Sequence, residues 1–477
     1  MNQSQYASTC IIATLGPVSA NPETIGALIE AGVDVFRLNF SHGEHETHAK
    51  TYALIRAQAE SRGKPIGILQ DLQGPKIRVR RFSEGKVQLE TGTPFTLSCA
   101  DASLGDKQRV GVTYTELFRD LTPGTRLLLD DGKLELNVTE IKGEDIITEV
   151  TRGGQLSDRK GINIPGADLS VPALTDKDVE DLQFGAELGV DWVAMSFVRT
   201  DDDVKLARHY LKRARSQAKL MAKIEKPSAV HRFDQILAAA DGIMVARGDL
   251  GVELSPEQVP MVQKRLINQA REAGKPVVTA TQMLESMIGH PIPTRAEAND
   301  VANAIFDGSD GIMLSAETAT GKYPVEAVAQ MTRIAMAVES DPAYREAMRN
   351  RTVSTQQTVF DSVAHSACRM AREIEAKVIV TFSASGSTAL RVARHRVPQT
   401  VLAITPTPAA YRQLSTSWGV IPVMAEEISN SDEMVAAANH AIISSGVAKP
   451  GDRYVITAGV PFGVTGSTNL IRVEIVS

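Results

Sequence analysis

Eight short apolar runs recur along the chain, and they constrain its fold more than any other feature of the sequence. They lie at residues 10–16, 33–40, 65–72, 191–198, 219–225, 242–250, 276–283 and 311–318. Nearly continuous apolar character is typical of parallel strands that are buried on both faces. Helix-like amphipathic stretches lie between most of the runs. The pattern therefore predicts a (β/α)8 TIM barrel, with an open doubly wound sheet as the alternative.

Helix boundary signals fall between these runs. Asn21 and Pro22 are typical of an N-cap followed by the first helical residue, and Gly32 has the character of a residue just past a helix end. Thr294 and Glu297 have the spacing of a capping box, in which each side chain accepts a backbone hydrogen bond from the other residue. These signals favour alternating strands and helices.

Two long segments depart from this pattern. Residues 74–170 contain alternating runs punctuated by glycine, with a hairpin signal at Asp131-Gly132, and they predict an inserted small β-barrel domain that acts as a lid. Residues 345–477 alternate strand-like and helix-like runs, and they predict a C-terminal open-sheet α/β domain with a regulatory role. The barrel is then expected to comprise residues 1–73 and 171–344.

Composition excludes several classes of protein. The chain has 477 residues, of which 43% are hydrophobic and 23% charged, and its net charge of −6 argues against nucleic-acid binding. The three cysteines, Cys10, Cys99 and Cys368, form no CxxC pair, so we expect neither a disulfide scaffold nor a thiolate zinc site. No apolar run reaches the length of about 18 residues that a membrane span requires. No signal-peptide pattern opens the sequence, and we expect a cytoplasmic protein without a membrane partner.

Polar residues stand where the predicted barrel strands end. In this fold the carboxyl ends of the strands form one rim, and catalytic groups gather there. Buried strands do not need such groups for stability, because an unpaired buried charge is costly. The rim residues are Thr14, Arg37, Asn39, Ser41, Asp71, Lys223, Glu225, Arg247, Asp249, Thr279, Thr281, Ser315 and Glu317.

The charged residues of the fifth and sixth runs indicate the chemistry. Lys223 and Glu225 lie on the same side of a strand, because side chains alternate with a period of two. Glu225 and Asp249 supply two oxygen ligands, which suit Mg²⁺ or Mn²⁺ with further ligands from water or substrate. A lysine beside such an ion is typical of phosphoryl transfer. The alternative interpretation is a Lys–Glu ion pair that only closes the rim.

Two further motifs are less specific. The stretch HGEHETH at 42–48 lacks HExxH spacing, and a polar helix start is favoured over a zinc site. No Gly-Lys is followed by Ser or Thr, so a Walker A loop is excluded. The loop TFSASGST at 381–388 offers hydroxyl groups before a helix, which favours phosphate binding over a simple N-cap. The candidate effector residues there are Thr381, Ser383, Ser385, Gly386, Ser387 and Thr388.

Taken together, these motifs resemble the pyruvate kinase family over nearly the whole chain. The stretches that carry the resemblance are RLNFSHG (37–43), LQDLQGPKIR (69–78), KIEKP (223–227), MVARGDLGVE (244–253), ATQMLESM (280–287), PTRAEANDVANAI (293–305) and MLSAET (313–318). The resemblance implies transfer of a phosphoryl group from phosphoenolpyruvate to ADP, which gives pyruvate and ATP. It also implies a homotetramer with a phosphorylated small-molecule effector bound in the C-terminal domain.

The resemblance implies a role for each matching residue. Lys223 matches the lysine that stabilises the phosphoryl group and the enolate, and Arg37 matches a phosphate ligand. Thr281 and Ser315 match groups on the proton path. The residues implied to bind phosphoenolpyruvate are Arg37, Lys223, Gly248, Asp249 and Thr281. The implied metal ligands are Glu225 and Asp249, and the implied nucleotide contacts are Asn39, His42, Arg78 and Lys160.

One departure from the family pattern concerns potassium. Many relatives hold K⁺ with an Asn, a Ser, an Asp and a Thr, and they carry a Glu shortly afterwards. Asn39, Ser41 and Asp71 keep this pattern, whereas Leu72 replaces the Thr and Lys76 replaces the Glu. The chain thus resembles the K⁺-independent branch. We expect Lys76 to pair with Asp71 and to supply the missing charge, so that K⁺ is not required.

Two other functions remain open at this level. An Mg²⁺-dependent barrel lyase or aldolase acting on phosphoenolpyruvate or a 2-keto acid also uses Lys, Glu and Asp at a barrel rim. Lys160 in the inserted domain argues against it, because a lyase needs no nucleotide clamp. A non-enzymatic sensor of sugar phosphates is the second alternative, and the complete rim argues against that.

Overall fold

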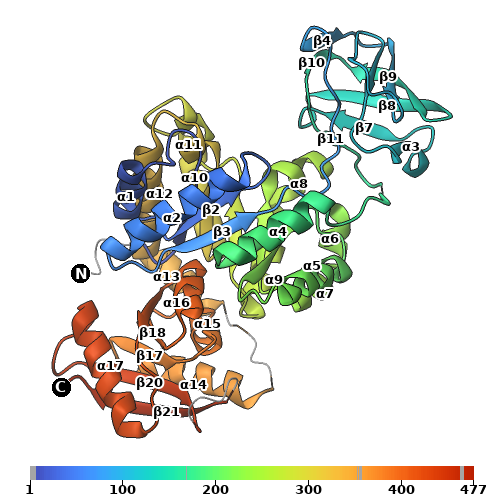
Figure 1. Cartoon of the computed structure of the whole chain (residues 1–477). Helices are drawn as coiled ribbons and strands as arrows, with labels where there is room; N and C mark the ends of the chain where they lie inside the picture. The colour runs from blue at the N-terminus through green and yellow to red at the C-terminus, as the bar shows by residue number, and fades with distance from the viewer. Residues whose placement is uncertain (1–6, 168, 352, 354–356, 462–466) are drawn as a thin grey trace.

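Eight parallel strands close into a barrel at the centre of the molecule (Figure 1). The structure is a computed structural model that describes residues 7–167, 169–351, 353, 357–461 and 467–477. The strands are β1 (Cys10–Thr14), β2 (Val35–Asn39), β3 (Gly67–Asp71), β12 (Trp192–Met195), β13 (Lys219–Ile224), β14 (Gly242–Ala246), β15 (Val277–Ala280) and β16 (Gly311–Leu314). Each falls in one of the eight apolar runs, and their order is β1-β16-β15-β14-β13-β12-β3-β2. The predicted barrel is confirmed, and the open-sheet alternative is wrong for this part of the chain.

Helices surround the barrel and bury the outer faces of its strands. They are α1 (Pro22–Ala31), α2 (His45–Ser61), α4 (Asp176–Leu188), α5 (Asp201–Arg213), α6 (Pro227–His231), α7 (Phe233–Ala239), α8 (Arg247–Glu253), α9 (Val259–Glu272), η2 (Glu285–Ile288), α10 (Arg295–Asp307), α11 (Ala316–Ala319), α12 (Pro324–Ser340) and α13 (Pro342–Asn350). Asn21 caps α1, and Thr294 and Glu297 form the expected capping box of α10. Inside the barrel a second core includes Trp192, Met221 and Met244. Burial on both faces explains why the strands read as continuous apolar runs.

A repeated aspartate joins the strands in pairs at the end of the barrel where they begin. Each aspartate immediately precedes the second strand of a pair, and its side chain accepts a hydrogen bond from a backbone N–H at the start of the first strand. The four bonds run from Ile11 to Asp34 (2.8 Å), from Ile68 to Asp191 (2.9 Å), from Leu220 to Asp241 (2.9 Å) and from Val277 to Asp310 (3.0 Å). The pairs are β1/β2, β3/β12, β13/β14 and β15/β16, so the barrel closes from four similar units.

The inserted domain is built from β-strands, as predicted. It contains β4 (Lys86–Leu89), β5 (Pro94–Ser98), β6 (Arg109–Gly111), α3 (Leu117–Asp120), β7 (Arg126–Leu129), β8 (Leu134–Lys142), β9 (Asp145–Arg152), β10 (Gly154–Ser157) and β11 (Ile162–Asn163). Six strands follow the order β11-β7-β8-β9-β5-β6, and β10 pairs with β4. Single bridges from Arg78 to Gly161 and from Val79 to Val112 join the two edges, which closes the sheet as a small barrel. All these strand pairs are antiparallel except β5 with β6.

The inserted domain projects from the barrel on two chain segments (Figure 1). The outgoing linker, residues 72–76, continues from β3, and the returning linker, described at residues 164–167 and 169–175, precedes α4. Asn163 Nδ2 donates to Glu253 Oε1 of α8 at 3.1 Å, so the base of the domain contacts the rim. This placement is the one that a lid over the rim requires.

The C-terminal domain is an α/β unit with an open sheet, as predicted. Its strands are β17 (Val378–Phe382), β18 (Thr400–Thr405), β19 (Val420–Met424), β20 (Arg453–Gly459) and β21 (Thr468–Ile475), in the order β19-β18-β17-β20-β21. Its helices are α14 (Val359–Glu373), α15 (Ser387–Ala393), α16 (Pro408–Gln413), η3 (Leu414–Thr416) and α17 (Ser431–Ser445). Only β21 runs antiparallel to its neighbour in this sheet.

The C-terminal domain packs on the barrel end where the strands begin. Arg412 Nε pairs with Asp191 Oδ1 at 2.7 Å, and Trp192 Nε1 donates to the Gln413 carbonyl at 3.2 Å. The opposite end of the barrel, which carries the rim, faces the inserted domain. Within the described ranges, no helix is both long and apolar enough to cross a membrane. Cys10, Cys99 and Cys368 are buried and free.

Candidate active site

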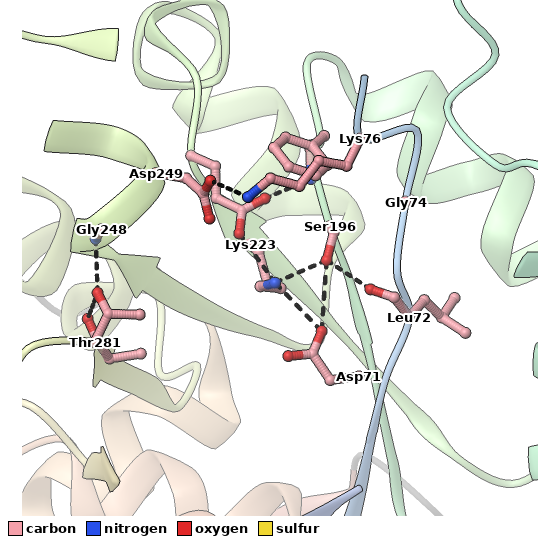
Figure 2. Close-up of polar contacts among 12 residues, drawn as sticks. Asp71, Leu72, Gly74, Lys76, Ser196, Lys223, Gly248, Asp249 and Thr281 are labelled. Atoms are coloured by element: carbon pink, nitrogen blue, oxygen red, sulfur yellow. Dashed lines mark hydrogen bonds and ion pairs between the residues drawn. The ribbon is translucent and has the colours of Figure 1, made fainter. Parts of the chain in front are cut away.

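Lys223 lies at the centre of the rim, at the end of β13 (Figure 2). Its ammonium contacts three acceptors from three strands: Ser196 Oγ at 2.7 Å, Glu225 Oε1 at 2.9 Å and Asp71 Oδ1 at 3.3 Å. A lysine has three N–H donors, so each donor has a partner. Burial alone would lower the pKa of Lys223, but Asp71 and Glu225 more than offset this and raise the pKa above its ordinary value. The ammonium is therefore a fixed positive charge.

Asp71 connects Lys223 to Arg37. Arg37 Nε contacts Asp71 Oδ2 at 2.6 Å, and Arg37 Nη1 donates to Thr14 Oγ1 at 3.0 Å. Burial would raise the pKa of Asp71, but Lys223 and Arg37 outweigh it and lower the pKa below its ordinary value. The carboxylate thus stays ionised and holds both cations in place, as parallel strands that end together allow.

Glu225 and Asp249 are the two carboxylates that the sequence assigned to a metal ion. Glu225 Oε2 accepts the Phe197 N–H at 2.6 Å, and Asp249 lies in the first turn of α8 with 24% of its side chain exposed. Burial raises the pKa of Glu225, and Asp249 raises it further against the opposing effect of Lys223. Two facing carboxylates of this kind are stabilised by a cation between them. In the described part of the chain no group of three or more metal-binding side chains gathers, so the pair suits Mg²⁺ or Mn²⁺ that keeps other oxygen ligands.

Lys76 has a different partner from the one expected. Its ammonium contacts Asp249 Oδ1 at 3.1 Å, whereas the partners of Asp71 are Arg37 and Lys223. The prediction of a Lys76–Asp71 pair is therefore wrong in this structure. The reason is the backbone of Gly74, whose φ of +69° turns the chain after β3 and directs Lys76 toward α8. Figure 2 shows the Lys76 ammonium beside Asp249, away from Asp71.

Thr281 and Gly248 come together from neighbouring strands. The Gly248 N–H donates to Thr281 Oγ1 at 2.6 Å. Thr281 has a φ of +72° and Gln282 a φ of +54°, which non-glycine residues seldom adopt. Arg247 Nη2 donates to the Thr281 carbonyl at 2.9 Å and so holds this strained turn. The hydroxyl is placed beside the start of α8, where an anionic group of a substrate is favoured.

The other predicted rim residues have different positions: Asn39 ends β2, Ser41 and Ser315 follow β2 and β16, and Glu317 lies in α11. Thr279 is buried within β15, where its hydroxyl bonds Ser309 at 2.8 Å. Asn39 Oδ1 accepts the Ser41 N–H at 3.2 Å, and the Ser315 N–H donates to Glu317 Oε2 at 2.7 Å. Burial raises the pKa of Glu317. His42 is exposed just before α2. The structure brings Ser315 to the same rim as Lys223, while Asn39, Ser41 and His42 lie at its β2 side.

Two of the three histidines of the 42–48 stretch, His45 and His48, have packing roles. His45 stacks on Phe184 with ring centroids 4.1 Å apart, and His48 stacks on Phe40 at 4.0 Å. Helix α2 begins at His45, which agrees with the polar helix start that we favoured over a zinc site.

Arg78 and Lys160 lie together in the inserted domain. Arg78 Nη1 donates to the Arg159 carbonyl at 2.9 Å, and Lys160 Nζ pairs with Asp130 Oδ1 at 2.7 Å. The predicted nucleotide contacts are thus divided between two domains, with Asn39 and His42 on the barrel. Closure of the inserted domain would be needed to bring the two groups onto one nucleotide.

The 381–388 loop joins β17 to α15, as predicted, but its hydroxyls differ in exposure. Thr381 is buried and donates to the Leu402 carbonyl at 3.4 Å, and buried Thr388 pairs with Thr468 at 2.8 Å. Ser383, Ser385 and Ser387 are half-buried, and Gly386 has a φ of +78°. Thr381 and Thr388 therefore have partners outside the loop, and Ser385 Oγ donates to Ser387 Oγ within it at 3.2 Å. The sequence GVPFGVTGSTN at 459–469 does not distinguish a sugar monophosphate, a bisphosphate and AMP as the effector, and its residues 462–466 lie outside the described residues.

Sequence reasoning missed Ser196 and Phe197, which follow β12. Ser196 Oγ accepts from Lys223 and donates to the Leu72 carbonyl at 2.7 Å, so it joins Lys223 to the outgoing linker. The ring of Phe197 lies 5.9 Å from the ammonium groups of both Lys76 and Lys226. The strand-end rule applied to the fourth apolar run would have found Ser196. Phe197, with a φ of +54°, gives no such signal.

Comparisons with known proteins agree with this geometry. Residues 6–328 match the family described as pyruvate kinase, barrel domain, and residues 361–474 match pyruvate kinase, alpha/beta domain. A pyruvate kinase of Methylorubrum extorquens is 46% identical over 469 residues, covering 98% of this chain and 97% of that protein. One from Geobacillus stearothermophilus is 44% identical over 472 residues, covering 98% and 80%.

A solved structure gives the same result. The crystal structure of a pyruvate kinase from Cryptosporidium parvum superposes with a TM-score of 0.92 at 35% identity, covering 100% of this chain and 98% of that one. Both the barrel with its rim and the C-terminal domain are included in these matches. The chain belongs to the pyruvate kinase family, and it is a phosphotransferase.

Proposed function

We propose that the rim transfers the phosphoryl group of phosphoenolpyruvate to ADP, with Lys223 as the central catalytic residue. The observation that carries this proposal is the ammonium of Lys223, which three acceptors hold in a buried position. A charge that is already oriented stabilises a transition state without further reorganisation. Arg37, fixed by Asp71 and Thr14, adds a second cation for the phosphoryl oxygens.

The rim residues divide the chemistry into two stages. In the first, Lys223 and Arg37 stabilise the negative charge that develops on the phosphoryl oxygens and on the enolate. In the second, the hydroxyl groups of Thr281 and Ser315 serve the delivery of a proton to the methylene carbon, which completes pyruvate. Glu225 and Asp249 would hold Mg²⁺ or Mn²⁺, which when bound supplies further positive charge to the substrate oxygens.

The inserted domain acts in this proposal as a lid for the nucleotide. Arg78 and Lys160 are its candidate contacts with the ADP phosphates, while Gly248, Asp249 and Thr281 hold phosphoenolpyruvate on the rim. Closure excludes water from the phosphoryl group and so prevents its hydrolysis.

A coupled assay of pyruvate formation tests the proposed reaction. With phosphoenolpyruvate, Mg²⁺ and ADP we expect rapid pyruvate formation, and without ADP we expect almost none. Pyruvate formation that did not depend on ADP would favour the lyase or aldolase alternative instead. Lys223→Met should abolish the activity while leaving the fold intact, as circular dichroism would show.

We further propose that the enzyme does not require K⁺. Lys76 places an ammonium on Asp249 of the rim, where it contributes a monovalent positive charge without a bound ion. Asp71 is already neutralised by Arg37 and Lys223, so it does not need K⁺ for that purpose. Activity in buffer free of K⁺ and Na⁺ should therefore be close to activity with K⁺ added.

Regulation and assembly complete the proposal. A phosphorylated effector would bind at the half-buried hydroxyls of Ser383, Ser385 and Ser387, next to the N–H groups after Gly386. If Ser383→Ala and Ser387→Ala leave every response to sugar phosphates and AMP unchanged, this site assignment is wrong. The enzyme is also proposed to be a homotetramer, which light scattering would measure directly.

A further inference from the structure

A single buried carboxylate contacts both linkers of the inserted domain. Asp178 lies in the first turn of α4 and has no exposed surface. Its Oδ1 accepts the N–H of Gly74, in the outgoing linker, at 2.9 Å. Its Oδ2 accepts the N–H of Thr175, at the end of the returning linker, at 2.9 Å, and the Thr175 hydroxyl at 2.6 Å. Asp178 thus joins two points that are 101 residues apart in the sequence (175 minus 74).

Capping of α4 accounts for only part of this arrangement. The capping box requires the reciprocal bonds between Thr175 and Asp178, which use one carboxylate oxygen. A second Thr-x-x-Asp box begins α5, where Asp203 Oδ2 accepts the N–H groups of Thr200 and Arg199. Those partners lie within four residues of Asp203. The bond from Gly74 to the other oxygen of Asp178 is therefore an addition that a helix cap does not need.

Gly74 is held on its other side as well. A Cβ at this position would lie 2.9 Å from Phe197 Cδ2 and 2.9 Å from Ser196 Cβ, and the φ of +69° is unfavourable for other residues. The turn is therefore fitted between Asp178 on one side and the Ser196–Phe197 segment on the other. Neither wall belongs to the inserted domain.

The outgoing linker also reaches the catalytic residues. The carbonyl of Leu72, two residues before Gly74, accepts a hydrogen bond from the Ser196 hydroxyl, which in turn accepts one from the Lys223 ammonium. Lys76, two residues after Gly74, pairs with Asp249. Displacement of Gly74 would therefore move the contacts of Lys223 and of the candidate metal ligand together.

We propose that Asp178 is a positioning residue that fixes both linkers of the lid at one pivot, so that lid motion begins beyond Gly74 and leaves Leu72, with its contact to Ser196 and Lys223, undisturbed. The inference rests on the proposed function of the inserted domain as a lid. A carboxylate that accepts three bonds in a buried position is a rigid anchor, because loss of any acceptor leaves a buried donor unpaired.

Two variants separate the pivot from the helix cap. Asp178→Asn keeps the shape of the side chain but replaces one of its two acceptor oxygens with an NH₂ group. The Gly74 N–H and the Thr175 N–H, which bond different oxygens of Asp178, therefore cannot both keep their hydrogen bonds. Thr175→Val removes the hydroxyl of the same capping box and keeps the bond between Asp178 and Gly74. Both variants weaken the start of α4, and only Asp178→Asn disturbs the pivot.

Hydrogen exchange at the linker gives the direct readout. In Asp178→Asn we expect protection of the peptide that contains Gly74 to fall about tenfold or more, the effect of one charge-assisted hydrogen bond. Thr175→Val should leave that peptide unchanged. If Asp178→Asn does not fold, the wild type still tests the pivot. Because the Gly74 and Thr175 N–H groups both bond Asp178, these two amides should exchange with solvent in one correlated opening. Independent exchange of these two amides would overturn the proposal.

Kinetics provide the second readout. Asp178→Asn should raise the KM for ADP and lower kcat for pyruvate formation. Exchange of the methyl protons of pyruvate in D2O, with Mg²⁺ and inorganic phosphate but no nucleotide, should stay near the wild-type rate, because without nucleotide no lid closure pulls on Gly74 and displaces the rim contacts. Loss of both activities would show that Asp178 acts on the rim itself and would overturn the pivot. If the wild type forms no pyruvate with ADP, the proposed function fails. Amide hydrogen exchange at the Gly74 peptide, measured without nucleotide, still tests the pivot.

Discussion

Lys76 offers a sharp test of the proposal that the enzyme does not require K⁺. Its ammonium lies 3.1 Å from Asp249 Oδ1, and 22% and 24% of the two side chains are exposed. Unit charges about 4 Å apart attract by about 4 kcal/mol in a typical protein environment near the surface and by about 1 kcal/mol in water. Partial exposure places this pair between the two limits, so we expect an effect of about 1–3 kcal/mol on the rim.

Removal and reversal of the charge give graded results. Lys76→Met should lower kcat/KM in K⁺-free buffer by about 5- to 160-fold, the rate equivalent of that energy. Lys76→Glu should lower it further, because a second carboxylate then faces Asp249. Added K⁺ should restore much of the activity of Lys76→Glu, since the ion can lie between the two carboxylates, and should have little effect on the wild type.

Lys226 provides a matched control for this experiment. Its ammonium lies at the same 5.9 Å from the Phe197 ring as that of Lys76, but it pairs with Glu253 rather than Asp249. Lys226→Met should not create a response to K⁺. The assay is coupled pyruvate formation at increasing KCl, with a tetramethylammonium salt keeping ionic strength constant. Many-fold activation of the wild type by K⁺, or a Lys76→Glu variant indifferent to K⁺, would refute the reasoning.

Three further predictions follow from other contacts. Ser196→Ala removes one acceptor of Lys223 and should lower kcat about 10- to 100-fold, the cost of one hydrogen bond to a charged group, with little change in the KM for ADP; an unchanged kcat would contradict the role of Ser196. Gly74→Ala should impair both stability and activity, because its Cβ would collide with Ser196 and Phe197; a thermal midpoint equal to that of the wild type would show that the turn has more room. Burial raises the pKa of Asp34 to about 7 in the folded protein. Between about pH 4 and about pH 7 the folded protein therefore keeps a proton on Asp34 that the unfolded chain has released, so the free energy of unfolding should fall as pH rises through this range. Asp34→Asn should remove this loss, which thermal unfolding at about pH 5 and about pH 8 would show as a smaller difference between the two conditions.

The sequence was sufficient to predict the barrel and most of its rim. Parallel strands end at one edge, so polar residues that follow separate apolar runs must meet in space, and Lys223, Glu225 and Asp71 do so. The same rule applies at Thr281 and Ser315. Residues far apart in the sequence were brought together by the strand topology alone.

Backbone turns limited what the sequence could predict. The left-handed conformation of Gly74 directs Lys76 to Asp249, and no periodicity in the strand indicates that direction. Phe197 and Thr281 are also left-handed, although neither residue type favours that conformation. Asp178 was hidden for another reason, because a Thr-x-x-Asp pattern predicts a helix cap and says nothing of a second, distant partner.

The aspartates at the beginning of the strands have a consequence for how this chain tolerates large changes. The inserted domain separates β3 from β12 by more than a hundred residues, yet Asp191 still binds the N–H of Ile68 at the closed end of the barrel. In each two-strand unit the aspartate joins the strands where they begin, and no such bond is needed at the rim, where they end. New segments can therefore be added after a strand, at the rim end, without breaking the aspartate bond that joins the two strands where they begin.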